Sequence, residues 1–295
     1  MDIGQISTAM VTPFSSAGDV DFDRTGQLIE HLIANGTDSI VVCGTTGESP
    51  TLTVDEKEAL FKYTVETVNK RIPVIAGTGT FSTKETVKLT RMAEKAGADG
   101  IMLVAPYYNK PDQKGMYEHF KHVAGETTLP IMLYNIPGRS AVNMLPETII
   151  ALSKIKNIRA VKEASGDLDQ MSEIISGTDD QFLVYSGDDA LTLPILSIGG
   201  NGVVSVASHV AGPEMQKMIS LFKKGQFKEA AKIHRALVPL IHALFATPNP
   251  VPVKYALNKI GVETGGVRLP LAGFEGNNDA FDAVWESFKE NTLFN

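Results

Sequence analysis

Eight short apolar runs, rich in β-branched residues, recur along the chain and constrain its fold more than any other feature. Each run ends in small or polar residues and is followed by a stretch whose apolar side chains have helical spacing. The runs are Ile6 to Val11, Ser39 to Cys43, Pro73 to Ala76, Gly100 to Ala105, Pro130 to Tyr134, Arg159 to Val161, Phe182 to Tyr185 and Gly202 to Val206. Their ends lie 21 to 33 residues apart, which leaves room for one helical crossover between successive strands.

This repetition predicts an α/β protein, a (β/α)8 TIM barrel of parallel strands with the helices outside. Helices are expected over Asp55 to Lys70, over Lys84 to Ala96 with Gly97 as the C-cap, and over Pro146 to Ser153. The alternative is an open doubly wound sheet, which normally carries a glycine-rich phosphate loop early in the chain. Because Gly77-Thr78-Gly79 lacks the third glycine of that motif, the barrel is favoured.

The last quarter of the chain has a different pattern, which becomes wholly helical from about Gly225. Apolar residues at helical spacing run from Ala230 to Leu244, and prolines follow at positions 248, 250 and 252. We therefore expect a catalytic barrel over residues 1–224 and a C-terminal helical extension, packed on the barrel, over residues 225–295.

Composition and charge exclude several classes of protein. The 295 residues are 43% hydrophobic and 21% charged, which fits a globular α/β protein rather than a disordered one. The net charge of −7, without clusters of Lys and Arg, argues against a nucleic-acid partner. Ala190 to Pro213 contains no Asp, Glu, Lys or Arg, but a proline and three glycines interrupt it, so no membrane span is expected. The single cysteine, Cys43, fits a buried position in a cytoplasmic protein.

Lys162 closes the sixth apolar run and is the strongest candidate for chemistry. Active sites of TIM barrels lie at the C-terminal ends of the strands, where an inward-facing lysine has little structural purpose. Removed from water, its amine can lose its proton and attack a ketone to form a Schiff base. Tyr134 ends the neighbouring strand at matching depth, so both side chains are expected to point into the same mouth of the barrel.

Other strand ends carry residues suited to binding carboxylates and moving protons. Gly44-Thr45-Thr46-Gly47 places two hydroxyls beside glycines whose backbone N–H groups can approach a ligand. Arg139, on the Pro137-Gly138 loop, can hold a carboxylate with two parallel hydrogen bonds. Tyr107 and Tyr108 follow the fourth strand on a loop that we expect to be exposed.

Metal chemistry is less well supported. His119 and His122 lie three residues apart on a predicted helix, a spacing that could share a metal ion. Their neighbours Glu118 and Lys121 indicate instead a helix face in contact with solvent, so no metal site is predicted.

Four of these clusters together resemble the dihydrodipicolinate synthase family of pyruvate-dependent, Schiff-base class I aldolases. They are Gly44-Thr45-Thr46-Gly47-Glu48-Ser49, Ala105-Pro106-Tyr107-Tyr108-Asn109, Tyr134-Asn135-Ile136-Pro137-Gly138-Arg139 and Val161-Lys162-Glu163-Ala164, and the similarity extends to Ser186-Gly187-Asp188-Asp189 and Asn249 to Lys254. The resemblance implies condensation of pyruvate with L-aspartate 4-semialdehyde, the first committed step of diaminopimelate and lysine biosynthesis. It implies no metal or organic cofactor.

The resemblance also assigns roles to individual residues. Lys162 would form the imine with pyruvate, while Tyr134, Thr45 and Tyr108 would relay protons, with Tyr108 reaching in from a neighbouring subunit. The residues expected to bind the substrates are Thr45 and Thr46 for the pyruvate carboxylate, Arg139 for the carboxylate of the semialdehyde, and Gly187 and Val204 beside the lysine.

The same resemblance implies a homo-oligomer and bears on regulation. Sharing Tyr108 implies a dimer, and the usual form of the family is a tetramer built as a dimer of dimers. Some members bind lysine as a feedback inhibitor at a subunit interface. Val54, Lys57 and Phe81 replace two histidines and an asparagine of lysine-sensitive members, so weak or absent inhibition is expected here.

Two other functions stay open on the sequence. A sister aldolase, such as an N-acetylneuraminate lyase or a keto-deoxy sugar-acid aldolase, would share the lysine and the tyrosine. Arg139 and the Thr45-Thr46 pair argue against it. A barrel retained only for binding or regulation would be expected to have lost part of this constellation, yet every position is filled.

Overall fold

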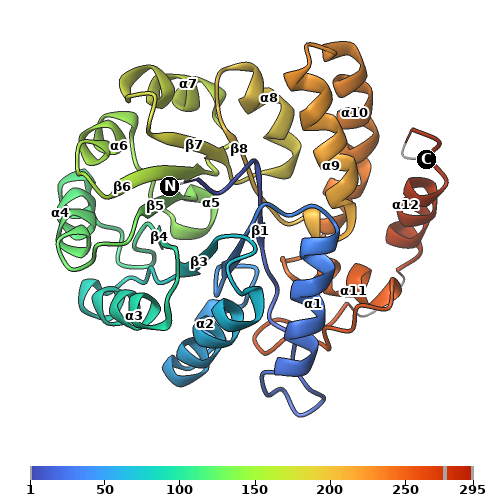
Figure 1. Cartoon of the computed structure of the whole chain (residues 1–295), viewed down its shortest axis with the longest axis horizontal. Helices are drawn as coiled ribbons and strands as arrows, with labels where there is room; N and C mark the ends of the chain where they lie inside the picture. Colours follow the sequence, from blue (N-terminus) through green and yellow to red (C-terminus); the bar gives the residue numbers. More distant parts are fainter. Residues whose placement is uncertain (1, 275–277, 294–295) are drawn as a thin grey trace.

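The centre of the molecule is a closed barrel of eight parallel strands in chain order, with β8 pairing back onto β1 (Figure 1). The structure is a computed structural model and describes residues 2–274 and 278–293. The strands are β1 (Ile6–Ala9), β2 (Ser39–Val42), β3 (Val74–Gly77), β4 (Gly100–Val104), β5 (Ile131–Asn135), β6 (Ile158–Glu163), β7 (Leu183–Ser186) and β8 (Gly202–Ser205). The predicted TIM barrel is therefore confirmed.

Helices surround the barrel and connect its strands (Figure 1). They are α1 (Phe22–Ala34), α2 (Val54–Val68), α3 (Thr83–Ala96), α4 (Gln113–Ala124), α5 (Pro137–Ser140), α6 (Pro146–Ser153), α7 (Leu168–Gly177), α8 (Thr192–Ser197) and α9 (Ser208–Lys223), with 3-10 turns η1 (Ser49–Thr51) and η2 (Asp189–Leu191). Helix α2 begins with a reciprocal pair: Thr53 Oγ1 accepts from the Glu56 N–H, and Glu56 accepts from the Thr53 N–H. Helix α3 ends at Gly97 in the left-handed conformation (φ 88°), as its sequence predicts.

The C-terminal extension is helical, as expected, and packs at one side of the barrel (Figure 1). It consists of α10 (Phe227–Leu244), α11 (Val251–Lys259) and α12 (Asp279–Lys289). The division of the chain at residue 225 stays a prediction. None of the helices in the described ranges is long and apolar enough to cross a membrane.

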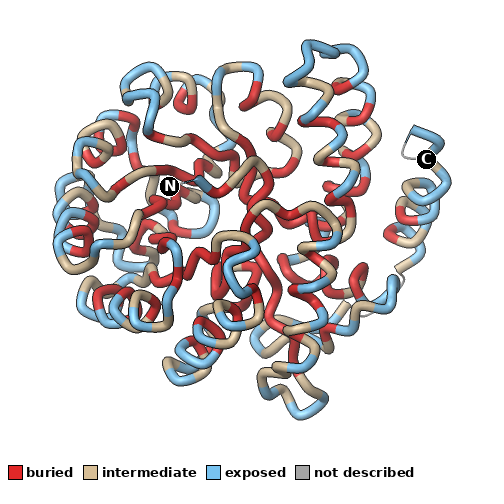
Figure 2. Tube along the Cα trace, viewed as in Figure 1, coloured by how far each residue is buried: buried red, intermediate tan, exposed pale blue. Residues whose placement is uncertain are grey.

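The strands at the centre of the molecule are buried along their length (Figure 2). Apolar side chains pack on both faces of these strands, which explains why the strands read as continuous hydrophobic runs. Along β2, Ile40 and Val42 pack outward against the helices, whereas Val41 belongs to a cluster inside the barrel. Tyr134 of β5 and Ala160 of β6 belong to that inner cluster as well. Because side chains alternate along a strand, Lys162 faces the interior on the same side as Ala160.

His209 is a buried histidine whose hydrogen bonds fix it in the neutral form. Its Nδ1–H donates to the carbonyl of Val206 at 2.8 Å, and its Nε2 accepts from the Val11 N–H at 3.2 Å. A proton on Nε2 would face that N–H donor. Burial accordingly lowers the pKa of His209 to about 4.

We predict that His209 makes the fold sensitive to mild acid. Its depressed pKa contributes stability that is complete above pH 6.5 and is lost as the pH falls from 6.5 to about 4, amounting to about 3 kcal/mol. Denaturant unfolding of the wild type and of His209→Gln between pH 7 and pH 4 measures this contribution. The variant should lose less stability over that interval; equal losses in the two proteins would contradict the prediction.

The interpretation of the helix that carries His119 and His122 is partly wrong. His119 does not face solvent: it is buried, its Nδ1 lies 2.9 Å from the Thr83 hydroxyl, and burial lowers its pKa to about 4. The amphipathic pattern of α4 turns this histidine toward α3. No cluster of metal-binding side chains occurs among the residues that the structure describes.

Candidate active site

Lys162 and Tyr134 occupy paired positions on β6 and β5, as their places at the strand ends predict. The Nζ atom of Lys162 lies 4.2 Å from the centroid of the Tyr134 ring, so the amine rests over the aromatic face. Only 5% of Lys162 is exposed, which removes its amine from bulk water. The two side chains therefore face one another inside the C-terminal mouth of the barrel.

Two of the buried lysines, Lys162 and Lys254, differ in a way that matters for chemistry. Lys254 forms an ion pair with Glu48, with 2.7 Å between Nζ and Oε1. The amine of Lys162 makes no ion pair or hydrogen bond with any residue that the structure describes; it rests on the Tyr134 ring. The amine of Lys162 can thus attack a carbonyl group without first leaving a carboxylate.

Gly187 packs directly against Lys162 and Ala164. A Cβ atom on Gly187 would lie 2.6 Å from the Ala164 Cβ and 3.0 Å from the Lys162 Cε, so any residue larger than glycine would displace the lysine. Val204 of β8 is buried in the inner cluster that also contains Tyr134. Gly187 thus lies directly beside Lys162, and the roles of Gly187 and Val204 in binding substrate stay predictions.

The loop after β2 presents the two threonines. Thr45 is half-buried and lines a cavity of about 240 Å³, whereas Thr46 is buried and its hydroxyl accepts a hydrogen bond from Asn249 at 2.9 Å. Glu48 follows in the left-handed conformation (φ 55°) and turns its carboxylate toward Lys254. The loop is therefore held by residues from the far end of the chain.

Arg139 lines the same cavity as Thr45 and Tyr134. It is exposed on α5, and its guanidinium makes no hydrogen bond or ion pair with another described residue, so the group is available for an anion. Arg139 and the threonines lie on different strand-end loops. Thr45 and Arg139 therefore offer a hydroxyl and a guanidinium at separate points of the cavity wall.

A polar network behind β5 and β6 anchors the loop that carries Arg139. Asn135 donates to both oxygens of the buried Glu163 carboxylate and to Asn143, and Gln170 also donates to Glu163. Burial raises the pKa of Glu163, against the effect of hydrogen bonds from Asn135, Ser165 and Gln170. The network joins both ends of the arginine loop to the strand of Lys162.

Tyr108 does not reach the cavity of its own chain. It is 91% exposed and adopts the left-handed conformation (φ 71°), whereas its neighbour Tyr107 is half-buried and lines the cavity. Of the four residues predicted to be catalytic, the structure thus brings together Lys162, Tyr134 and Thr45 at one mouth and leaves Tyr108 on the surface.

The residues expected to govern lysine inhibition lie beside the same mouth. The Phe81 and Tyr107 rings make an edge contact with centroids 5.4 Å apart. Lys57 is buried, and burial lowers its pKa. Weak feedback inhibition stays a prediction.

Cys43, near Lys57, is buried and free. Burial raises the pKa of its thiol to about 12, which argues against a role as a nucleophile.

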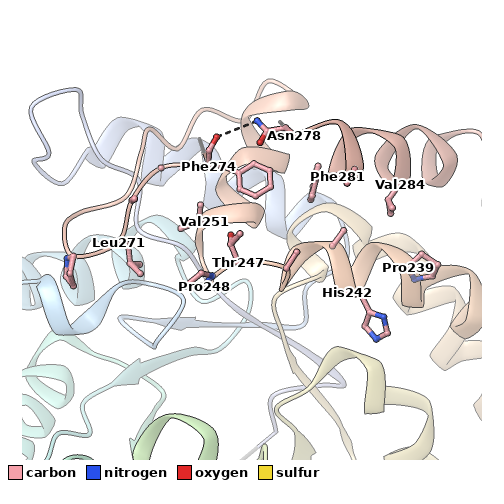
Figure 3. A pocket seen from close by; sticks show the side chains of 16 residues that line it. Pro239, His242, Thr247, Pro248, Val251, Leu271, Phe274, Asn278, Phe281 and Val284 are labelled. Carbon is pink, nitrogen blue, oxygen red and sulfur yellow. Dashed lines mark hydrogen bonds between the residues drawn. The ribbon is translucent and has the colours of Figure 1, made fainter. Parts of the chain in front are cut away.

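A larger cavity of about 800 Å³ lies in the C-terminal extension (Figure 3). Its walls are mostly apolar and include Val251 of α11, Phe274, and Phe281 and Val284 of α12. None of the residues proposed for chemistry lines it. The smaller cavity at the barrel mouth is therefore the candidate active site.

Sequence reasoning gave no role to three residues that shape this site. Asn249, Glu48 and Glu163 lie in motifs that were noted, yet their contacts join segments far apart in the chain. For Glu48 and Glu163, the signal in the sequence is an acidic residue inside a glycine-rich or apolar segment. A carboxylate buried in such a segment needs a hydrogen-bonding or charged partner.

The chain is similar to known proteins over almost its whole length. The model of the Dihydrodipicolinate synthetase family matches residues 2–283. A 4-hydroxy-tetrahydrodipicolinate synthase of Bacillus velezensis is 60% identical over 271 residues, which cover 92% of this chain and 94% of that protein. The crystal structure of a dihydrodipicolinate synthase of Bacillus anthracis superposes with a TM-score of 0.95 at 52% identity, covering 99% of each chain. A lysine-bound structure of the enzyme of Cyanidioschyzon merolae has a TM-score of 0.96 at 46% identity, covering 97% of this chain and 98% of that one.

Proposed function

Because the chain belongs to the dihydrodipicolinate synthetase family, we infer that it condenses pyruvate with L-aspartate 4-semialdehyde to give 4-hydroxy-tetrahydrodipicolinate. It is a Schiff-base lyase of lysine and diaminopimelate biosynthesis. The arrangement of Lys162, Tyr134 and Arg139 supports this activity.

The first half of the proposed mechanism activates pyruvate. The unprotonated amine of Lys162 attacks the ketone carbon, the carbinolamine loses water, and an imine forms. Thr45 and Thr46 bind the pyruvate carboxylate during these steps. A proton then leaves the methyl group, and its electron pair moves into the imine to give an enamine. The Tyr134 hydroxyl transfers protons to and from these intermediates.

The second half forms a carbon–carbon bond and closes the ring. Arg139 binds the carboxylate of the semialdehyde, and the enamine carbon attacks its aldehyde, whose oxygen takes up a proton to become the 4-hydroxyl group. The substrate's own amine then attacks the imine carbon and displaces Lys162. The balance is one pyruvate and one semialdehyde to one product and one water, and Lys162 is regenerated.

The observation that carries this proposal is a buried lysine, free of carboxylates, stacked on the tyrosine of the adjacent strand. Borohydride reduction in the presence of pyruvate, followed by peptide mass mapping, tests it. The reduced adduct should appear on the peptide that contains Lys162 and nowhere else. Assays with aspartate semialdehyde and with N-acetylneuraminate distinguish the proposed reaction from that of a sister aldolase.

We also propose that the protein works as an oligomer, a dimer of dimers in the family's usual form, in which Tyr108 enters the site of a second copy. Its 91% exposure in the single chain supports this proposal, since a proton relay through Tyr108 requires another chain to bury it. The buried, free Cys43 is consistent with a cytoplasmic location.

Mixing two inactive variants should restore activity if subunits share Tyr108. Tyr108→Phe is expected to lower kcat about 10²-fold because it removes one proton-transfer group. A 1:1 mixture with Lys162→Met, exchanged through mild denaturant and refolded, should recover about one quarter of wild-type sites, since one site of each heterodimer is intact. Lys162→Met mixed with itself is the control. A mixture no more active than its components would rule out the shared site.

A further inference from the structure

The hydroxyl of Thr46 is bound from outside the barrel by a residue of the C-terminal part of the chain. The amide Nδ2 of Asn249, between α10 and α11, donates to Thr46 Oγ1 at 2.9 Å, and both side chains are buried. Thr46 makes no other side-chain hydrogen bond with a residue that the structure describes. Asn249 therefore determines how this hydroxyl group is used.

The direction of that hydrogen bond has a chemical consequence. A hydroxyl has a single proton to donate, and an amide N–H can only be its donor. With one lone pair of Thr46 Oγ1 occupied by Asn249, the hydroxyl proton is left for another acceptor. A substrate carboxylate is acceptor-only, so it matches a hydroxyl held in this state.

The same part of the chain holds the rest of the loop. Lys254 pairs with Glu48 at 2.7 Å, and the N–H of Arg268 donates to the other oxygen of Glu48 at 2.9 Å. Arg268 also pairs with Glu56 at the start of α2. Residues 46, 48 and 56 are thus each bound by a residue between 249 and 268.

The buried ion pair between Lys254 and Glu48 is better explained by the position in which it holds the loop than by a gain in the free energy of unfolding. Burial lowers the pKa of Lys254 to about 8 although Glu48 acts in the opposite direction, so desolvation outweighs the attraction. A buried pair of this kind contributes little net stability, but it fixes the position of its partners. Here the partner is the loop that presents Thr46.

We propose that the C-terminal extension positions the substrate carboxylate site, with the Asn249 amide orienting the Thr46 hydroxyl as a hydrogen-bond donor. This proposal rests on the function inferred above, in which Thr46 binds pyruvate. Asn249 is a positioning residue, because it acts through Thr46.

Asn249→Asp is the sharpest test, because a carboxylate of the same shape would accept the Thr46 proton instead of donating to the hydroxyl. The KM for pyruvate, and the pyruvate concentration that half-saturates borohydride trapping at Lys162, should both rise about 10- to 100-fold. The KM for the semialdehyde should stay within about twofold, since Arg139 binds that substrate. Asn249→Ala, which leaves the hydroxyl free to rotate, should give a smaller increase in the same direction and serves if the aspartate variant does not fold.

Two controls separate positioning from general damage. Asn291→Asp adds the same charge beyond α12 and keeps the acceptor for the Leu293 N–H, so it should leave both KM values unchanged. In a Thr46→Val background, Asn249→Asp should add little further loss, because the hydroxyl that it reorients is absent. An unchanged KM for pyruvate in Asn249→Asp overturns the proposal; this is the result that the opposite orientation of the Asn249 amide would give. The proposal is also overturned if Asn249→Asp raises this KM by the same factor in the Thr46→Val background as in the wild type. If pyruvate traps no adduct on wild-type Lys162, the proposed function itself fails, and this inference falls with it.

Discussion

Replacement of Lys162 by methionine is expected to lower kcat by at least about 10⁴-fold and to abolish trapping of pyruvate by borohydride. Methionine keeps a similar volume against the Tyr134 ring but has no amine to form an imine. The melting temperature of the variant should not fall, because the side chain of Lys162 has no ion pair or hydrogen bond to lose with the residues that the structure describes. Steady-state assays and mass mapping measure both effects.

Lys156→Met is the matched control for this variant. Lys156 is exposed just before β6, at the opposite end of the strand that carries Lys162. Its replacement should leave kcat and trapping at wild-type values. More than about 1% residual activity in Lys162→Met, with its fold intact, would be incompatible with a nucleophilic role for that residue.

The second large effect concerns stability. Lys254→Met should lower the free energy of unfolding by about 3 kcal/mol or more, because it leaves the Glu48 carboxylate buried without its cation. The side chains of the pair are 2% and 1% exposed, so water cannot replace the lost partner. Denaturant unfolding at a fixed protein concentration measures this loss.

Lys259→Met, on the same helix, provides the comparison. Its pair with Asp282 has a similar distance of 2.8 Å, but the side chains are 27% and 37% exposed. Solvent screens such a pair, so the loss should be below about 1 kcal/mol. Adding Glu48→Gln to Lys254→Met should recover part of the stability, since the glutamine is neutral and still accepts from the Arg268 N–H. Equal losses for Lys254→Met and Lys259→Met would show that burial does not govern these pairs.

The features predicted correctly from the sequence are those that depend on local pattern. Continuous apolar runs and helix signals such as Gly97 place the strands and helices within a few residues of their observed ends, and the paired depth of Tyr134 and Lys162 follows from counting strand ends. The short helix α5, which carries Arg139, was not predicted, because four residues give no periodicity. The burial of His119 was missed because its charged neighbours suggested a solvent-facing helix surface.

Contacts between distant segments could not be predicted, because no local pattern encodes them. Glu48 reads as a loop residue until α11 brings Lys254 against it, and Asn249 reads as a turn residue between two prolines. The network of Glu163, Asn135 and Gln170 likewise depends on how β5, β6 and α7 pack. These residues determine how accurately the predicted site is positioned.

The bonds that join residues 46–56 to residues 249–268 also set an order for biosynthesis of the enzyme. A chain emerging from the ribosome exposes the loop after β2 long before α11 exists, and domains fold largely in the order of synthesis. That loop can acquire these contacts only after residues 249–268 have been made. The part of the site that we propose for the pyruvate carboxylate is therefore completed later than the strands that carry Tyr134 and Lys162.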